Sequence, residues 1–160
     1  MKFFAIADMH FGHEAIIRYC NRPYKTVQEM DEDLIKRWNE TVSNKDTVLV
    51  LGDVCLGNKE YAKSIIGRLN GKKILIMGNH DNWSEQFYRD AGFHTVSRFP
   101  ILWNNFYLLS HAPLQLFQNV PYKNIFGHVH NDPLYQDTEN RQCVSVERID
   151  YRPVLLLEIN

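Results

Sequence analysis

Apolar runs recur along the first half of the chain, and segments with helical spacing separate them. The runs read KFFAIA, TVLVL and KKILIM, and continuous apolar stretches of this length predict buried strands. They cover Lys2–Ala7, Thr47–Leu51 and Lys72–Met77. The intervening segments predict four helices. The first runs from Glu14 to a break at Asn21–Pro23, and the second runs from a capping box at Thr26 and Glu29 to about Val42. The other two cover Lys59–Leu69 and Trp83–Ala91, with Ser84 near the start of the last.

The second half of the chain is dominated by short strands. After Gly92 the pattern predicts strands at Thr95–Phe99, Phe106–Ser110, Asn124–Phe126, Cys143–Glu147 and Val154–Ile159. Alternation of strand and helix, followed by strands alone, predicts a layered α/β fold whose C-terminal half contributes a mixed sheet region. A length of 160 residues fits a single domain over 1–160, with little room for a cap domain.

Composition and charge argue against several classes of protein. The formal net charge is −1, so long-range electrostatics predict attraction neither to nucleic acid nor to a membrane surface. The apolar runs fall far short of the roughly 20 residues that span a bilayer. Asp8 and His10 interrupt the apolar start of the chain without a cleavage site, which argues against a signal peptide. Three well-separated cysteines favour reduced thiols and a cytoplasmic protein.

Polar clusters with metal-binding side chains directly follow five of the predicted strands. They are DMH (Asp8, His10), GD (Asp53), GNHD (Asn79, His80, Asp81), SHAP (His111) and GHVH (His128, His130). Each has an ordinary structural reading by itself, because GD is common in turns and a lone histidine is commonly a hydrogen-bonded core residue. Together they indicate one site, because ligands of open α/β sheets bind at the carboxyl ends of the strands.

The side chains in these clusters favour a particular kind of metal site. Carboxylates, imidazoles and one amide, without a thiolate, suit Mn²⁺, Fe, Zn²⁺, Co²⁺ or Ni²⁺. Seven candidate ligands are too many for one tetrahedral zinc ion, and they fit two ions that share a bridging carboxylate. Two ions about 3.5–4 Å apart clamp the oxygens of an in-line displacement at phosphorus.

The ordered set Asp-x-His, Gly-Asp, Gly-Asn-His-Asp, His and Gly-His-x-His resembles the calcineurin-like metallophosphoesterases, over nearly the whole chain from Asp8 to His130. DMHFGH, CNRPYKTVQEMDEDLIKRWN and DYRPVLLLEI further resemble small prokaryotic and phage members. The resemblance implies a four-layer α/β/β/α sandwich with mixed sheets. It implies two divalent transition-metal ions, with manganese the first candidate: one held by Asp8, His10, Asp53 and His130, the other by Asp53, Asn79, His111 and His128.

The resemblance also implies a reaction. A hydroxide bridging the two ions would attack phosphorus in line, and His80 would protonate the leaving oxygen as a general acid. The Gly-Asp motif continues as GDVCLG without a nearby arginine, unlike that of protein phosphatases, which argues against phosphoprotein substrates. We therefore expect hydrolysis of phosphodiesters, on nucleotides or nucleic-acid ends, with phosphomonoesters as a second substrate class.

Two other functions remain open on the sequence. A degraded member of the same fold would be a binding or scaffold module, although His80 and all of the implied ligands are present here. A structural-zinc or nucleic-acid-binding protein is disfavoured by the lack of thiolate ligands and by the slightly negative charge.

For several residues beside the motifs, a substrate-binding role and a structural role are both consistent with the sequence. His13 and Arg18 could bind a substrate phosphate, or His13 could cap the following helix. Trp83, Phe87 and Tyr88 could stack on a base, with core packing the alternative, above all for Phe87.

The GNHD motif carries its own ambiguity. Gly78 is expected to permit a sharp exit from the strand, so that Asn79 and His80 are placed with little freedom. Asp81 could orient His80 or tighten the turn.

Overall fold

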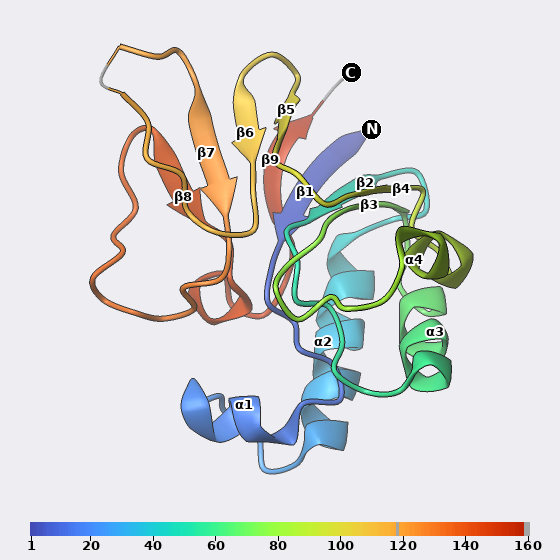
Figure 1. The fold of residues 1–160 in the computed structure, drawn as a ribbon. Helices are drawn as coiled ribbons and strands as arrows, with labels where there is room; N and C mark the ends of the chain where they lie inside the picture. Colours follow the sequence, from blue (N-terminus) through green and yellow to red (C-terminus); the bar gives the residue numbers. More distant parts are fainter. Residues whose placement is uncertain (118, 159–160) are drawn as a thin grey trace.

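The computed structural model describes residues 1–117 and 119–158, and its first sheet is built from both ends of the chain. The strands are β4 (Thr95–Ser97), β3 (Lys72–Ile76), β2 (Thr47–Val50), β1 (Lys2–Ile6) and β9 (Val154–Glu158), in that order across the sheet. The pairs between β1, β2, β3 and β4 are parallel, whereas β9 is antiparallel to β1. The carboxyl ends of the four parallel strands therefore share one edge (Figure 1).

The second sheet comes from the second half of the chain. Its strands are β5 (Ile101–Trp103), β6 (Tyr107–Leu109), β7 (Lys123–Phe126) and β8 (Arg141–Cys143), also in that order. The β5–β6 pair is antiparallel, and the β6–β7 and β7–β8 pairs are parallel. Both sheets are thus mixed, and the predicted α/β class with mixed sheets is confirmed.

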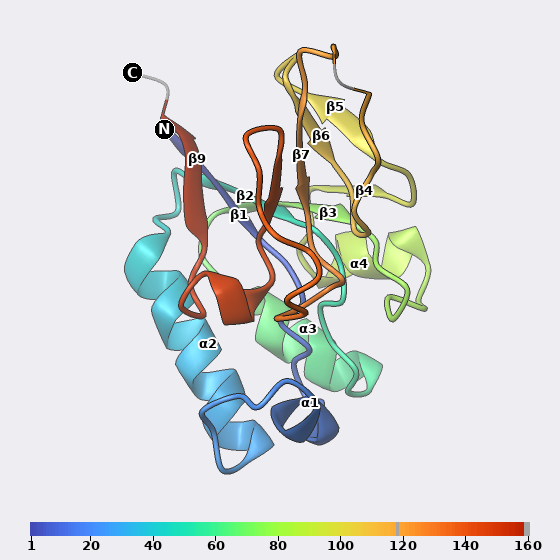
Figure 2. The same cartoon turned by 90° about the vertical axis from the view of Figure 1, so that its left-hand side faces the viewer.

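The helices of the described residues gather around the first sheet. They are α1 (Glu14–Tyr19), α2 (Val27–Thr41), α3 (Lys59–Gly67) and α4 (Glu85–Ala91), with a 3-10 helix η1 (Val146–Arg148). Side chains of α2, α3 and α4 pack on one face of this sheet, and α1 lies beyond its carboxyl end (Figures 1 and 2). Among residues 1–117 and 119–158, loops rather than an α-helix lie outside the second sheet, where the Leu114 N–H donates to Asn124 Oδ1 of β7.

The helix starts have local causes. Thr26 accepts a hydrogen bond from the Glu29 N–H, Asn58 from the Tyr61 N–H, and Ser84 from the Phe87 N–H. These caps satisfy backbone donors that the first turn of a helix leaves unpaired. Ser84 therefore fixes the start of α4 at Glu85, two residues after the predicted start at Trp83.

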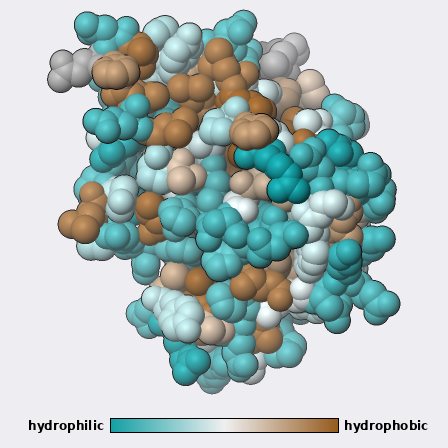
Figure 3. Space-filling view, in the orientation of Figure 1, coloured by the Kyte–Doolittle hydropathy of each residue, from teal (hydrophilic) through white to brown (hydrophobic). Residues whose placement is uncertain are grey.

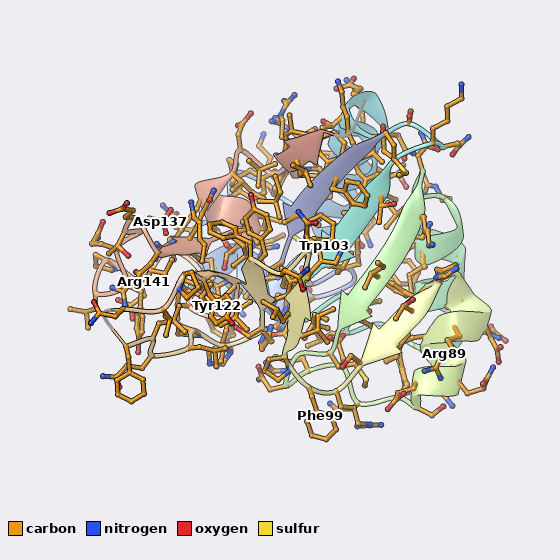
Figure 4. All side chains as sticks on the ribbon, turned by 90° about the horizontal axis from the view of Figure 1, so that it is seen from above. Arg89, Phe99, Trp103, Tyr122, Asp137 and Arg141 are labelled. Carbon is orange, nitrogen blue, oxygen red and sulfur yellow. The ribbon has the colours of Figure 1, made fainter. Side chains whose placement is uncertain are left out.

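Two hydrophobic cores follow from the alternation of side chains along the strands. One lies between the helices and the first sheet; the other fills the space between the two sheets and includes Leu49, Leu51, Ile125 and Val144. Trp103 packs at the margin of this second core, with its ring centroid 4.9 Å from that of Phe3 (Figure 4). The space between the sheets is thus filled by side chains.

The strand predicted at Cys143–Glu147 has the wrong bounds, because β8 covers Arg141–Cys143. The strand ends at Cys143, and η1 forms over Val146–Arg148. The reason lies in the backbone, because Val144 O and Val146 N–H both bond to Ala7, the residue directly after β1, and turn the chain away. The short strand β5 was not predicted, and Ile159 of the last predicted strand lies outside the described residues.

Within the described residues, every helix is too short or too polar to cross a bilayer. Figure 3 shows hydrophilic residues over the middle of one face and hydrophobic residues gathered toward its upper end. Exposed large apolar side chains include Phe99, Leu102, Phe106 and Phe117.

Gly127 provides a test of the close contact between the sheets. A Cβ at this position would lie 2.4 Å from Ala7 Cβ and 2.6 Å from Asp8 Oδ2. We expect Gly127→Ala to lower the free energy of unfolding by about 2 kcal/mol or more, measured by urea denaturation. Gly67→Ala is the control, because a Cβ there meets nothing within 4 Å and an alanine at this exposed helical position should stabilise by about 0.5–1 kcal/mol. Equal effects of the two substitutions would contradict the packing argument.

Candidate metal centre

The strand ends bring the predicted ligands together. Asp8 and His10 follow β1, Asp53 follows β2, Asn79 follows β3, His111 follows β6, and His128 and His130 follow β7. Asp8, His10 and Asp53 are buried, whereas Asn79, His80 and His128 are exposed. The cluster is therefore closed on the protein side and open to solvent on the other.

Five of the seven candidate ligands have left-handed backbone conformations. Asp8, His10, Asp53, His128 and His130 have φ values of 60°, 52°, 55°, 72° and 49°. A non-glycine residue in this region costs on the order of 1–2 kcal/mol, and such strain concentrates where function requires it. Successive strand exits are thus bent so that their side chains turn towards a common centre.

Asp8, His10 and His130 form the first group, with ligand atoms all within 4.8 Å of one another. Asp8 Oδ2 accepts hydrogen bonds from Ser145 Oγ (2.6 Å) and the His128 N–H (2.8 Å). Asp8 Oδ1 and His10 Nε2 are buried and have no hydrogen-bond partner among the described residues. Two buried lone pairs without donors fit a cation better than they fit a closed polar core.

Asp53, His111 and His128 form the second group, and Asn79 joins it. Asn79 Oδ1 lies 2.9 Å from His111 Nε2 and 3.0 Å from His128 Nδ1, and the two ring nitrogens are 3.1 Å apart. His111 Nδ1 lies 2.7 Å from the Leu51 carbonyl, which can only accept, so Nδ1 carries a proton. In the neutral ring, His111 Nε2 then carries the lone pair that could bind an ion.

Asp53 joins the two groups. Its Oδ2 lies 3.4 Å from His10 Nε2 of the first group and 3.4 Å from His111 Nε2 of the second. Its Oδ1 accepts a hydrogen bond from the His80 backbone N–H (2.9 Å). One oxygen is therefore fixed by the backbone while the other faces both groups, which is the placement that a bridging carboxylate requires.

The turns that carry Asp53 and Asn79 are locked to each other by Asp81. Its Oδ2 accepts from the N–H groups of Asp53 and Gly78 (2.8 Å each), and its Oδ1 accepts from the Val54 N–H (3.0 Å). Asp81 thus tightens the turn and makes no hydrogen bond to the His80 ring.

Space explains Gly78 better than backbone conformation does. A Cβ there would lie 2.3 Å from Asp53 Oδ1, and Gly78 is not among the residues with positive φ. Gly78 is therefore needed because Asp53 approaches its backbone closely, and not because the chain makes a sharp turn there.

The electrostatics of the cluster suit a cation. Burial lowers the pKa of His10 to about 4 and raises that of Asp8 to about 6. Burial opposes ionisation of Asp53, but the adjacent imidazoles of His10 and His111 hold its pKa well below the usual range. Burial also opposes the charge of His111, yet its bond with Asp53 and the nearby Asp8 raise its pKa to about 9. In the metal-free protein, protons bound to these side chains reduce the repulsion between them, and a bound ion would displace such protons.

The three residues expected to face substrate lie at different distances from the candidate ligands. The His80 side chain is exposed, and its ring centroid lies 5.4 Å from that of His10. His13 joins the cluster edge, with Nδ1 3.2 Å from His10 Nδ1, and its side chain does not cap α1. Arg18 is exposed and lines a hollow with Glu14, Ile17 and Lys25, apart from the candidate ligands.

Several residues that shape the cluster were missed at the level of sequence. Ser145 and Glu147 lie in a segment that was predicted as strand, and Arg22 lies in the break after α1. Glu147 Oε1 accepts from His130 Nδ1 (3.0 Å) and from the guanidinium of Arg22. Cys20 is close to His130 and Glu147 as well, and Glu147 Oε2 is buried without a hydrogen-bond partner among the described residues.

Comparison with known families decides the relationship. The model of the calcineurin-like phosphoesterase family matches residues 1–154. The chain belongs to this family. Its metal-binding Asp and His groups and its hydrolase-type site are those expected of a metallophosphoesterase.

The chain is also similar to individual proteins from an archaeon and a phage and to a solved structure. An uncharacterized protein of Methanocaldococcus jannaschii is 37% identical over 97% of this chain and 87% of that protein. The Gene 66 protein of Mycobacterium phage L5 is 36% identical over 47% of this chain but only 37% of its own length. A solved structure of a protein of unknown function from Aquifex aeolicus superposes with a TM-score of 0.72, at 24% identity and with 96% and 95% of the two chains covered. That likeness concerns the fold.

Asp81→Asn tests the lock between the two turns. The amide replaces one accepting oxygen by a donor that faces backbone N–H groups, so we expect the free energy of unfolding to fall by about 2–4 kcal/mol. Asp90→Asn is the control, because Asp90 is exposed and its side chain accepts from Gln86 Nε2 alone among the described residues, so its effect should stay within about 0.5 kcal/mol. Urea denaturation of both variants makes the comparison, and equal stability would refute the lock.

Proposed function

We propose that this metallophosphoesterase is a dinuclear enzyme that hydrolyses phosphodiester bonds. The observation that carries the proposal is the position of Asp53 Oδ2, at 3.4 Å from one histidine of each ligand group. A single carboxylate oxygen between two clusters of donors is the arrangement that two neighbouring ions need.

Each ion has a candidate set of ligands. Asp8, His10, Asp53 and His130 would hold the first, and Asp53, Asn79, His111 and His128 would hold the second. The fit is supported by the unpartnered atoms Asp8 Oδ1 and His10 Nε2 and by three potential lone-pair donors within about 3 Å at Asn79. Nitrogen and oxygen ligands favour Mn²⁺ first, with Fe, Zn²⁺, Co²⁺ or Ni²⁺ as alternatives. When bound, such ions neutralise phosphate charge and lower the pKa of water to about 7.

His80 is the proposed general acid. Its backbone is fixed by the bond to Asp53 Oδ1, while its imidazole is exposed at the open side of the cluster. A ring so placed can donate a proton to the oxygen that leaves phosphorus. Asp53 and Asn79 serve the reaction by holding the ions, and His13, at the edge of the same cluster, is available to bind a phosphate oxygen.

A hollow beside His80 supports the choice of a diester with a sizeable leaving group. It has a volume of about 270 Å³ and is lined by Cys55, Leu56, Gly57, His80, Asn82 and Trp83. Trp83 is half-buried against Phe87, whereas Phe87 and Tyr88 are in the core. Of the three aromatic residues considered for base stacking, only Trp83 lines this hollow, so we propose nucleotides or nucleic-acid ends as substrates.

A cytoplasmic location is also part of the proposal. All three cysteines are free and buried, which is consistent with a reducing cytoplasm. Action without a cap domain remains a prediction, as do the native metal and the possibility of phosphomonoester hydrolysis.

Substrate class and metal dependence can be measured together. The protein is stripped of metal, reloaded with Mn²⁺, and assayed with bis-p-nitrophenyl phosphate and p-nitrophenyl phosphate. We expect faster cleavage of the diester and its loss in Asp53→Asn, with fewer than two Mn²⁺ bound per chain by calorimetry. Asp90→Asn should behave as wild type. Preference for the monoester would redirect the proposal to phosphatases, and two bound ions without turnover would favour the binding module.

His80→Ala separates proton donation from metal binding. We expect turnover of an alkyl phosphodiester to fall about 10²–10⁴-fold, because an alkoxide leaves poorly without a proton. The loss should be smaller with nitrophenyl esters, whose leaving group needs little protonation, and bound Mn²⁺ should be unchanged. His94→Ala is the control, since His94 is exposed and contacts Thr95 away from the cluster. Unchanged turnover of the alkyl ester in His80→Ala would exclude this role.

A further inference from the structure

Arg22 makes a buried set of contacts behind the candidate metal centre. Only 4% of its surface is exposed. Its Nη2 donates to the Asp8 carbonyl (2.7 Å) and its Nη1 to the Met9 carbonyl (2.9 Å). Its Nε and Nη2 also donate to Glu147 Oε1, at 2.9 and 2.7 Å. The guanidinium therefore binds two consecutive carbonyls and one carboxylate at once, which a planar fork of donors allows.

These two carbonyls belong to the most constrained part of the cluster. Asp8 and His10 flank Met9 and both have left-handed backbone conformations. The same turn is held from the other side, where the N–H groups of Asp8 and His10 donate to the carbonyls of Gly52 and Asp53. Arg22 completes this arrangement, because without it the Asp8 and Met9 carbonyls would be buried without these donors.

Glu147 carries the contact across to the second sheet. It lies in η1, 125 residues after Arg22, and its Oε1 also accepts from His130 Nδ1 (3.0 Å). A histidine that donates one ring N–H to a carboxylate has its orientation fixed and its other nitrogen left for a metal. Arg148 of the same 3-10 helix donates to the His130 carbonyl, so η1 holds both the ring and the backbone of His130.

The contacts are confined to the first group of ligands. Arg22 and Glu147 touch the backbone of Asp8 and Met9 and the ring of His130. The second group has further supports that neither residue touches, because His111 bonds to Leu51 O and Asp53 bonds to the His80 N–H. The two groups are linked through Asp53 and through the bond from the His128 N–H to Asp8 Oδ2. The charges of Arg22 and Glu147 cancel, so the pair can stand next to a divalent ion without repelling it.

We propose that the Arg22–Glu147 ion pair is a positioning unit that sets Asp8, His10 and His130 for one of the two metal ions and leaves the other ion's ligands alone. The inference rests on the proposed metal site but adds residues that no ligand pattern contains. Loss of a hydrogen-bonded support behind a metal ligand typically weakens metal affinity by about 10–100-fold. Substitution of Arg22 or Glu147 should therefore weaken the affinity for one ion more than the affinity for the other, although the two ions share a bridging carboxylate.

Calorimetric titration of the metal-free chain with Mn²⁺ tests the unit. In Glu147→Gln we expect one of the two binding steps to weaken about 10–100-fold and the other to stay within about 3-fold of wild type. Arg22→Lys keeps the charge but cannot reach all of the acceptors, so it should weaken the same step. Turnover in both variants should return towards wild type when Mn²⁺ is raised, which a general loss of folding would not allow.

Arg68 and Glu32 provide a matched control. They form a two-bonded ion pair of the same residue types at 2.7 and 2.6 Å, between α2 and α3 and exposed to solvent. Glu32→Gln and Arg68→Lys should leave both binding steps unchanged.

Each outcome has a defined meaning. Unchanged affinities in folded Glu147→Gln and Arg22→Lys would overturn the proposal, as would equal weakening of both steps. If Glu147→Gln does not fold, as judged by circular dichroism, Arg22→Lys decides. Wild-type protein that binds no Mn²⁺ or other candidate ion would instead overturn the proposed function, which is a separate result.

Discussion

The candidate site depends on one junction between the two sheets, where the end of β1 meets the end of β8. The Ala7 N–H donates to Val144 O, and Ala7 O accepts from the Val146 N–H. Directly after this bridge, the Asp8 carboxylate accepts from Ser145 Oγ and the His128 N–H, which follow β8 and β7 of the second sheet. Because these bonds join two separate sheets at their carboxyl ends, ligands from β1, β2 and β3 face ligands from β6 and β7 across a fixed gap.

The features that could be predicted from the sequence are those set by local or periodic patterns of residues. Strands, helices and the residues that follow each strand could be read from periodicity, because parallel strands deliver their carboxyl ends to one edge whatever the register. Contacts between distant segments could not be read in this way. Arg22 and Glu147 look like ordinary solvated charges in a loop and a strand, and only the fold shows that they meet. The bend at Ser145–Val146 likewise follows from bonds to Ala7, which no pattern within residues 143–147 encodes.

The cluster is maintained at a cost to stability. Left-handed conformations at five ligand residues, buried unpartnered atoms at Asp8 and His10, and a buried ion pair all disfavour folding relative to an apolar core. Compensation comes from two hydrophobic cores that flank the first sheet and from Asp81, which satisfies three backbone donors in the turns. Such local conflicts, embedded in an otherwise consistent fold, are the expected signature of a functional site.

Two candidate ligands, His111 and His130, differ from His80, the proposed proton donor, in how their rings are held. His111 bonds to a carbonyl through Nδ1 and His130 to Glu147 through Nδ1, so each ring is oriented with one nitrogen committed to the protein. His80 is held differently, because its backbone N–H is fixed by Asp53 while its ring is exposed. A metal ligand gains from a fixed ring, since misorientation weakens the bond to the ion. A proton donor must instead follow the leaving oxygen, and an exposed ring on a fixed backbone can do so without disturbing the carboxylate beside it.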